Sequence, residues 1–356
     1  MIPASGLKKI LVISLQISPR YWGYRDIGRI LCHELASLGY HVTVLTVSGP
    51  KGIDEYAKDV VVLRKPSLAD SLKVMLEADV VFHNNISLSL GWLGFLLLKP
   101  QVIRHATWIN DPQVFSITSF IKTTFLHRAY NIANSLAIAQ HLPVHSIVIG
   151  NPYDAVLFRV FDNIPRDRDL IFVGRLVSDK GVDLLLQALA TLVNIGLHPS
   201  TTIVGGGPEE DNLKKMTQDL GLEGLVHFIG FLQGEELVEI LNAHRILVVP
   251  SQWREPFGIV ALEGIACGCA VVGSEGGGLK DAIGPCGLTF QNGDVEGLAR
   301  CLERLLRDSA LITTYLAAAH LHLQAHHPRS VVQKYLQVME AAYLRRPLPA
   351  GSSSES

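Results

Sequence analysis

Short apolar runs alternate with amphipathic stretches along most of the 356 residues. The β-branched runs Lys8–Leu15 and His41–Val47 are typical of buried strands. The stretch Ile27–Leu38 between them has the periodicity of a helix, which Gly39 closes. Further strands are predicted at Val60–Leu63, Val80–His83, Val102–Thr107 and Ile147–Ile149. Alternating strands and helices predict parallel strands joined by crossover helices, which is a doubly wound α/β sheet.

The same alternation starts again after a charged, Pro-containing connection near residues 150–169. Strands are predicted at residues 169–175, 201–207, 226–230, 246–251 and 270–274, and helices at Val182–Ile195, Pro208–Leu220, Glu235–Ala243 and from about Val260. Two successive sets predict two Rossmann-like, doubly wound domains facing a cleft. We place the domains at residues 1–160 and 161–328, a helix crossing back at 329–346, and a disordered tail at 347–356.

The length allows two domains that each bury a core, and 48% hydrophobic against 18% charged residues excludes a disordered chain. Five cysteines without a Cys-x-x-Cys pair argue against a disulfide scaffold and a zinc ribbon, and favour a reducing compartment. The N-terminus lacks a signal-peptide pattern, so we expect a cytoplasmic protein. The run Ile86–Leu98 has 13 residues, too few to span a bilayer, and is interpreted as a buried helix.

Charge is distributed unevenly between the two halves of the chain. Residues 1–160 hold 15 Lys/Arg against 10 Asp/Glu, a net +5, whereas the remainder holds 16 against 23, a net −7. A basic first half favours an anionic surface or acceptor, including peripheral contact with the inner face of a membrane. Ordinary scatter of solvated charge is an equally good interpretation. We expect no nucleic-acid partner.

In a doubly wound sheet, ligands bind beyond the carboxyl ends of the strands. The predicted strands of the second half are followed there by two cations, two carboxylates and two glycine-rich turns, namely Arg175 and Lys180, Glu255 and Glu263, Gly205–Gly207 and Gly276–Gly278. Cations at a helix start suit a diphosphate, and carboxylates accept hydrogen bonds from hydroxyl groups. A nucleotide sugar carries hydroxyls on both sides of its diphosphate, so this set matches it from end to end.

Four segments carry a family resemblance: "FVGRLVSDKGVDLLLQAL", "IVGGGPEEDNL", "VHFIGFL" and "EPFGIVALEGIACGCAVVGSEGGG". Together they resemble the donor domain of retaining glycosyltransferases of family four, which have the GT-B fold. In the first half, "CHELASLGYHVTVLT" and "VIRHAT" resemble that family's first helix, second strand and the strand that ends in a functional histidine.

The resemblance implies an acceptor-binding first domain, a donor-binding second domain and a role for each matching residue. Arg175 and Lys180 would hold the diphosphate as leaving group, Glu263 the ribose, and Glu255 and His105 the transferred sugar. The implied donor-binding residues are Gly174, Gly205, Gly207, Phe231, Pro256, Phe257, Gly258, Ile259, Val260 and Glu263. On the acceptor side we expect Tyr21, Trp22, Gly23 and Asn84, where the aromatic loop departs from the family's usual glycine pair. The family uses no metal and no cofactor.

The predicted function is therefore transfer of a sugar, with retention, from UDP-glucose or another UDP-hexose to a saccharide or lipid-linked acceptor in polysaccharide or glycoconjugate synthesis. The alternatives are a GDP-mannose-dependent mannosyltransferase and a catalytically silent binding subunit. A dinucleotide fingerprint is disfavoured because Glu210 occupies its third glycine position. The Asp167–Asp169 triplet is interpreted as chance in the hinge, and His322 with His326 as helix surface without a third metal ligand.

Overall fold

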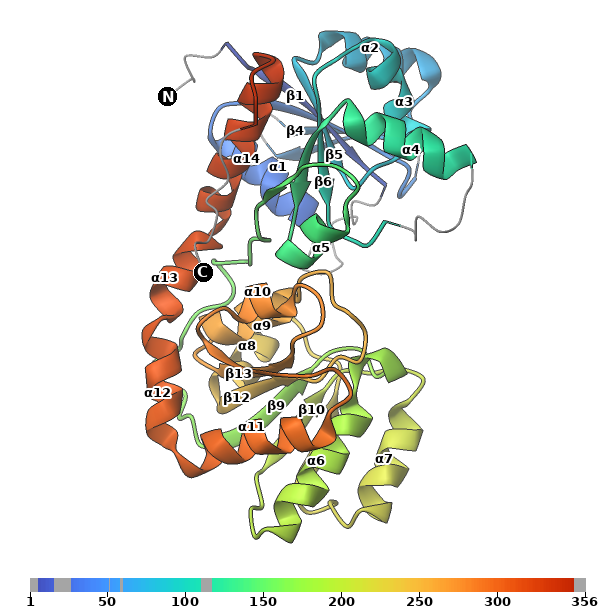
Figure 1. The fold of residues 1–356 in the computed structure, drawn as a ribbon. Helices are drawn as coiled ribbons and strands as arrows, with labels where there is room; N and C mark the ends of the chain where they lie inside the picture. Colours follow the sequence, from blue (N-terminus) through green and yellow to red (C-terminus); the bar gives the residue numbers. More distant parts are fainter. Residues whose placement is uncertain (1–5, 16–26, 51, 58–59, 110–116, 349–356) are drawn as a thin grey trace. The chain divides into compact units, whose positions relative to one another are not determined.

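The computed structural model describes residues 6–15, 27–50, 52–57, 60–109 and 117–348. Contacts between Cα atoms divide the chain into unit 1, residues 1–152 and 328–356, and unit 2, residues 153–327 (Figure 1). The sequence placed the first boundary after residue 160. It falls after Pro152 because Tyr153, Leu157 and Phe158 pack into a hydrophobic core of unit 2.

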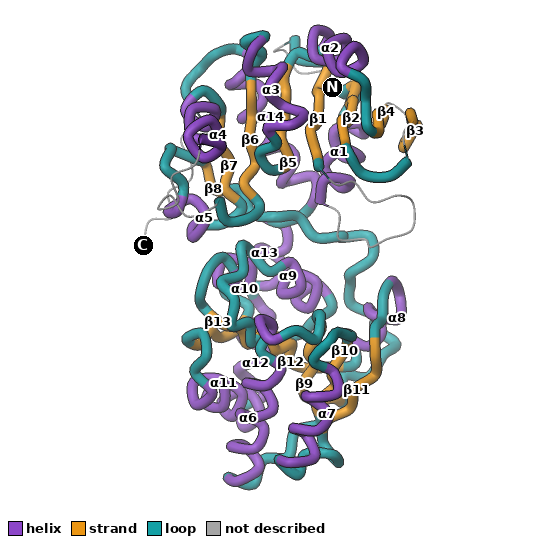
Figure 2. Tube along the Cα trace, turned by 90° about the vertical axis from the view of Figure 1, so that its right-hand side faces the viewer, coloured by secondary structure: helices purple, strands orange, loops and turns teal. Residues whose placement is uncertain are grey.

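Within the described residues, unit 1 holds a sheet whose strands run in the order β3-β4-β2-β1-β5-β6-β7-β8 (Figure 2). The strands are β1 (Lys9–Ser14), β2 (His41–Thr46), β3 (Gly52–Ala57), β4 (Val60–Arg64), β5 (Val80–Asn84), β6 (Gln101–His105), β7 (Tyr130–Ala133) and β8 (Ile147–Val148). β3 pairs antiparallel with β4, whereas the other pairings are parallel. The strand order reverses between β1 and β5, which is the switch point where doubly wound sheets bind ligands.

Helices on both faces of this sheet bury its apolar side chains. They are α1 (Ile27–Ser37), α2 (Leu68–Glu77), α3 (Leu88–Leu96), α4 (Ile117–His127), α5 (Leu136–His141) and α14 (Pro328–Tyr343). α1 and α14 share one core with the sheet, to which α14 contributes Val331, Tyr335 and Met339. The predicted buried helix at 86–98 is wrong in part, since α3 buries Leu93 and Phe95 but exposes its opposite side.

Unit 2 contains a parallel sheet in the order β11-β10-β9-β12-β13-β14, with its switch point between β9 and β12. The strands are β9 (Arg168–Val173), β10 (Thr201–Val204), β11 (Val226–Gly230), β12 (His244–Val249), β13 (Ala270–Ser274) and β14 (Gly287–Phe290). The helices are α6 (Val182–Asn194), α7 (Glu210–Asp219), α8 (Gly234–Asn242), α9 (Ile259–Ala266), α10 (Leu279–Ile283), α11 (Val295–Arg307), α12 (Ser309–Ala317) and α13 (Ala319–Ala325). One core lies under α6 and α11 and a second under α8, α9 and α10. The two Rossmann-like units predicted from sequence are confirmed.

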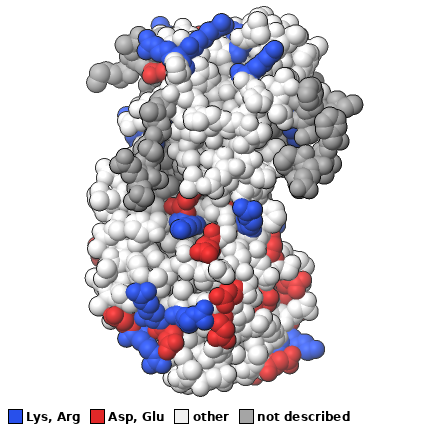
Figure 3. All heavy atoms as spheres, in the orientation of Figure 1, with Lys and Arg blue, Asp and Glu red and all other residues white. Residues whose placement is uncertain are grey.

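Charged side chains are distributed differently on the two units. On the face drawn in Figure 3, unit 1 shows Lys and Arg with little Asp or Glu, whereas unit 2 shows both signs interspersed. Among the described residues, every helix is too short or too polar to cross a bilayer.

Candidate functional site

The candidate site of unit 2 is built at the carboxyl ends of β9 and β12, the two strands that flank its switch point. After β9 the chain passes through exposed Arg175 into a single 3₁₀ turn, Ser178–Lys180, and then into α6. Gly181 joins the turn to the helix with φ of 70°, and a Cβ there would lie 2.0 Å from the Pro250 carbonyl oxygen. Glycine at 181 therefore lets the loops after β9 and β12 touch.

Lys180 and Glu255, which lie 75 residues apart in sequence, form an ion pair at this edge. The Lys180 Nζ atom donates to Glu255 Oε1 at 2.5 Å, and the two side chains are 22% and 14% exposed. Ser251 Oγ donates to the same Oε1 atom at 2.9 Å. The fold thus brings together the cation predicted for the diphosphate and the carboxylate predicted for the sugar. The pair is largely desolvated but remains accessible to solvent.

Backbone hydrogen bonds tie three loops around this pair. The Asp179 carbonyl accepts from the Gln252 and Trp253 amides at 2.9 and 3.2 Å. The Gly278 amide donates to the Glu255 carbonyl at 2.7 Å, and a Cβ on Gly277 would lie 2.3 Å from that oxygen. The glycine-rich turn after β13 is therefore needed to let the Glu255 loop approach.

Asn292 is a supporting residue that the sequence analysis missed. Its Nδ2 group donates to the Ser251 carbonyl at 3.0 Å, and its Oδ1 atom accepts from the Gly276 amide at 2.7 Å. Asn292 follows β14, a four-residue strand that was not predicted because its "GLTF" segment is short and lacks clear alternation. Ser251 ends the predicted strand at 246–251, and this position at a carboxyl end could have identified it as a candidate site residue.

The helices that begin at this edge have N-termini without side-chain caps. α6, α7, α9 and α10 start without a side-chain cap, and three of them begin after a glycine, namely Gly181, Gly258 and Gly278. The first amides of a helix need hydrogen-bond acceptors and carry partial positive charge. With Arg175 and Lys180 beside them, these amides make the edge chemically suited to an anionic group such as a diphosphate.

The glycines predicted to let a ligand approach also allow close packing between two loops of the protein itself. A Cβ on Gly205, where φ is 142°, would lie 1.8 Å from the Gly174 carbonyl oxygen. A Cβ on Gly207 would lie 2.3 Å from the Leu176 carbonyl oxygen. Because the Leu176 amide also donates to Gly206, the loops after β9 and β10 pack backbone against backbone. This packing alone requires glycine at 205 and 207.

The remaining predicted donor residues differ in exposure. Phe257 is buried in the core, and its ring centroid lies 5.5 Å from that of His326. Glu263 is buried within α9, whereas Phe231 is 69% exposed. Pro256, Gly258, Ile259 and Val260 are half-buried around the start of α9. Contacts of these residues with a donor stay predictions.

In unit 1 the predicted His105 ends β6, and its orientation is fixed by Asn131 on β7. His105 Nε2 lies 3.0 Å from Asn131 Oδ1. The Asn131 Nδ2 group already donates to the Leu126 and Ala129 carbonyls, so Oδ1 must accept from the histidine. His105 is therefore the Nε2–H tautomer and presents Nδ1 as an acceptor. Burial lowers the pKa of His105, partly offset by the Asn131 bond, and the Arg104 charge lowers it further.

Next to His105, Arg104 is a buried cation that the sequence analysis did not select. Its guanidinium donates to Asn84 Oδ1 at 2.5 Å and to Asn151 Oδ1 at 2.6 Å. Asn84 in turn donates to Ser14 Oγ across the switch point at 3.3 Å. Asn84, which was predicted on the acceptor side, is thus held at the carboxyl edge of the sheet by Ser14 and Arg104. Tyr21, Trp22 and Gly23 lie outside the described residues.

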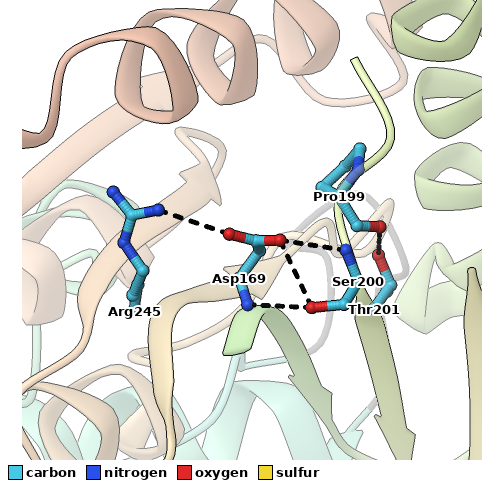
Figure 4. Close-up of polar contacts among 5 residues, drawn as sticks. All are labelled: Asp169, Pro199, Ser200, Thr201 and Arg245. Atoms are coloured by element: carbon cyan, nitrogen blue, oxygen red, sulfur yellow. Dashed lines mark hydrogen bonds and ion pairs between the residues drawn. The ribbon is translucent and has the colours of Figure 1, made fainter. Parts of the chain in front are cut away.

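Two weaker motifs have structural explanations. The Asp167–Asp169 triplet does not lie in the hinge, because Arg168 and Asp169 begin β9. Figure 4 shows the Asp169 carboxylate accepting from the Ser200 amide at 3.0 Å and from Arg245 Nη1 at 3.3 Å. This brace lies at the amino end of the sheet, away from the candidate site. His322 Nε2 donates to the Ala282 carbonyl at 2.8 Å, which joins α13 to α10.

Comparisons with known proteins identify a likeness to glycosyltransferases. Residues 156–319, most of unit 2, match the family model of glycosyl transferases group 1. Glycogen synthase of Mycobacterium tuberculosis is 36% identical over 182 residues, which cover 49% of this chain and 43% of that protein. The lipopolysaccharide core biosynthesis glycosyltransferase LpsE of Rhizobium meliloti is 34% identical over 181 residues, covering 49% and 51%. The matched segment spans about half the length of these curated relatives.

A solved structure extends the likeness to unit 1. Anabaena Alr3699/HepE in complex with UDP-glucose superposes with a TM-score of 0.72 at 21% identity, covering 94% of this chain and 99% of that one. At this identity the likeness shows the fold, which is the two-domain GT-B fold of glycosyltransferases.

Proposed function

We propose that the chain is a retaining glycosyltransferase that moves a hexose from a UDP-sugar, foremost UDP-glucose, to a saccharide or lipid-linked acceptor. The observation that carries this proposal is the Lys180–Glu255 pair, set among uncapped helix N-termini at the switch point of unit 2. The match of residues 156–319 to glycosyl transferases group 1 supports the same activity. The UDP-glucose bound by Anabaena HepE supports the choice of donor.

In this proposal each charged group has a separate task. Lys180 and Arg175 neutralise the diphosphate as it becomes the leaving group, together with the first amides of α6 and α9. Glu255 accepts hydrogen bonds from sugar hydroxyls, and Glu263 from the ribose. These cations and amides let the reaction proceed without a bound metal or cofactor. From unit 1, His105 presents Nδ1 to a hydroxyl of the transferred sugar.

The nature of the acceptor is argued from unit 1 and from one relative. The excess of Lys and Arg in the first half of the chain suits an anionic acceptor, and LpsE is a lipopolysaccharide core glycosyltransferase. We therefore propose a cytoplasmic enzyme that works peripherally at the inner face of a membrane, on polysaccharide or glycoconjugate precursors.

The decisive experiment is a thermal-shift panel of UDP- and GDP-sugars followed by an assay of donor turnover. A ligand that binds the native state raises the midpoint by mass action. We expect UDP-glucose to give the largest shift and to be consumed slowly by hydrolysis. A larger shift with GDP-mannose would replace this donor with the alternative one. Binding without turnover across a panel of acceptors would favour the catalytically silent subunit.

A further inference from the structure

The outward side of α3 in unit 1 is apolar where a soluble helix is normally polar. Trp92 and Leu96, one turn apart, are 43% and 68% exposed, and Leu98 just beyond the helix is 70% exposed. The inward side, with Leu93 and Phe95, already packs in the cores. Large apolar side chains exposed on a helix whose inward side is already packed indicate a second apolar contact surface. Leu98 also holds φ of 53°, a costly conformation for leucine.

The chain around α3 is depleted in carboxylates. Residues 80–153 contain one acidic residue, Asp111, where the average of 33 in 356 would give about seven in 74. The same stretch keeps four cations, Lys99, Arg104, Lys122 and Arg128. Strands β5 to β8 and helices α3 to α5 thus form a half-domain with almost nothing to repel an anionic surface.

A cationic pocket opens beside the apolar residues. It encloses roughly 400 Å³ and is lined by Lys99, Arg128 and Arg345 over the apolar Phe95 and Leu98, without a carboxylate in its lining. Lys99 Nζ donates to the Leu76 and Ala78 carbonyls at 2.7 and 2.8 Å, which fixes it at the end of α2. Leu76 is itself 55% exposed. Three cationic side chains and the exposed Leu98 therefore line one pocket, and Lys99 ties that pocket to the chain segment that carries Leu76.

We propose that this face, defined by Trp92, Leu96, Leu98, Lys99, Arg128 and Arg345, binds the surface of an anionic phospholipid bilayer. The leucines and the tryptophan enter the interface, while the cations pair with lipid phosphates. At a protein interface the apolar patch would be surrounded by polar groups of both charges. Here the pocket lining contains three cations and no carboxylate, which matches a surface of lipid phosphates. The proposal deepens the proposed function by naming the surface that brings the enzyme to a lipid-linked acceptor.

The test is flotation of the full chain with lipid vesicles in the absence of donor, so that its outcome is independent of transferase activity. Vesicles of phosphatidylcholine are compared with vesicles containing one third phosphatidylglycerol. We expect roughly ten-fold stronger binding to the anionic vesicles at low salt, falling at high salt as screening removes the electrostatic part. No binding to anionic vesicles at low salt would overturn the proposal, whether or not the chain turns over UDP-glucose.

Matched variants distinguish binding through this face from nonspecific adsorption to vesicles. Leu96→Ser combined with Leu98→Ser should lower vesicle binding about ten-fold, whereas Leu321→Ser, at a residue 73% exposed in unit 2, should leave it unchanged. Arg128→Gln with Arg345→Gln should remove most of the preference for anionic lipid, and Arg300→Gln on α11 should not. Equal binding by the leucine variant and its control would contradict the proposal. Unchanged thermal midpoints would show that the variants remain folded.

Discussion

The polar groups at the carboxyl edges of the two sheets differ in exposure and in hydrogen bonding. In unit 2, Lys180, Glu255 and Arg175 are partly or fully exposed, and the adjacent helix N-termini lack side-chain caps. In unit 1, His105 and Arg104 are buried and hydrogen-bonded to amides of their own domain. The unit 2 edge thus combines an accessible ion pair with uncapped helix N-termini, whereas the unit 1 edge holds a buried histidine and a buried arginine by hydrogen bonds within the domain.

From this difference we expect the unit 2 edge to contribute mainly binding energy and the unit 1 edge mainly orientation. Charges and helix amides that still need a partner supply binding energy to a charged ligand. Groups already fixed by their own hydrogen bonds supply a defined geometry at little further entropic cost. Substitutions at the two edges should therefore have effects of different size and kind.

The largest effect should come from Lys180→Ala. Losing a cation aimed at developing negative charge should lower kcat for sugar transfer by about 10² to 10³. Lys214→Ala is the matched control, since Lys214 forms an exposed pair with Glu210 on α7 and should change kcat less than two-fold. Steady-state kinetics on both variants make the measurement. A Lys180 variant that keeps its kcat would remove the unit 2 edge from the chemistry.

Next in size is Gly205→Ala, which tests whether the unit 2 edge depends on glycine for its own packing. A Cβ at this φ of 142° collides with the Gly174 carbonyl, so unfolding free energy should fall by about 3 kcal/mol. Gly224→Ala is the control, because its added Cβ has nothing within 4 Å. Chemical denaturation of both variants, read within unit 2, gives the result. Equal stabilities would mean that the loops after β9 and β10 can move apart freely.

Acid should then destabilise both units, foremost through His83 in unit 1 and His244 in unit 2. Burial lowers the pKa of His83 in unit 1 and of His244 in unit 2 to about 4. An unfolded imidazole binds a proton as pH falls through about 6.5, while the folded ones stay neutral until about 4. The contribution of each histidine to the free energy of unfolding is thus present above pH 6.5 and is lost as pH falls from 6.5 to 4, by about 2.5 kcal/mol at pH 4.5.

Hydrogen exchange monitored by mass spectrometry can measure this loss separately in β5 and β12. Rates at pH 6.5 and 4.5 must first be corrected for the intrinsic pH dependence of exchange. Corrected protection that is equal at the two pH values would show that these histidines are not neutral in the native state.

The smallest effect should be that of Asn131→Leu on the orientation of His105. Without the Oδ1 acceptor, Nε2–H has no partner in the described residues, so the two tautomers should approach equal populations and activity should fall about ten-fold. The ¹⁵N chemical shifts of the His105 ring report the tautomer directly. Asn134→Leu, at another buried asparagine after β7, should leave those shifts unchanged. A single unchanged tautomer in the Asn131 variant would refute its positioning role.

Local patterns were sufficient for the elements with strong periodicity. The strands at β1, β2, β9, β10 and β12 and the helices α1, α6 and α14 were predicted from apolar runs and closing glycines. The strands β3, β7 and β14 were missed: β7 and β14 have four residues each, and the β3 segment "GIDEYA" contains two acidic residues and lacks the apolar run of the predicted strands. The exposed side of α3 was also missed, since an all-apolar helix has no periodicity that distinguishes its two faces.

The sequence by itself determined the two α/β units and the candidate site positions after the strands, because strand period, helix period and turn residues are local properties. Only the tertiary structure decided that Lys180 pairs with Glu255, that Asn292 joins the loops beside them, and that Asn131 selects the tautomer of His105. Those contacts join residues up to 75 positions apart, and no local pattern encodes which strand ends become neighbours in a sheet.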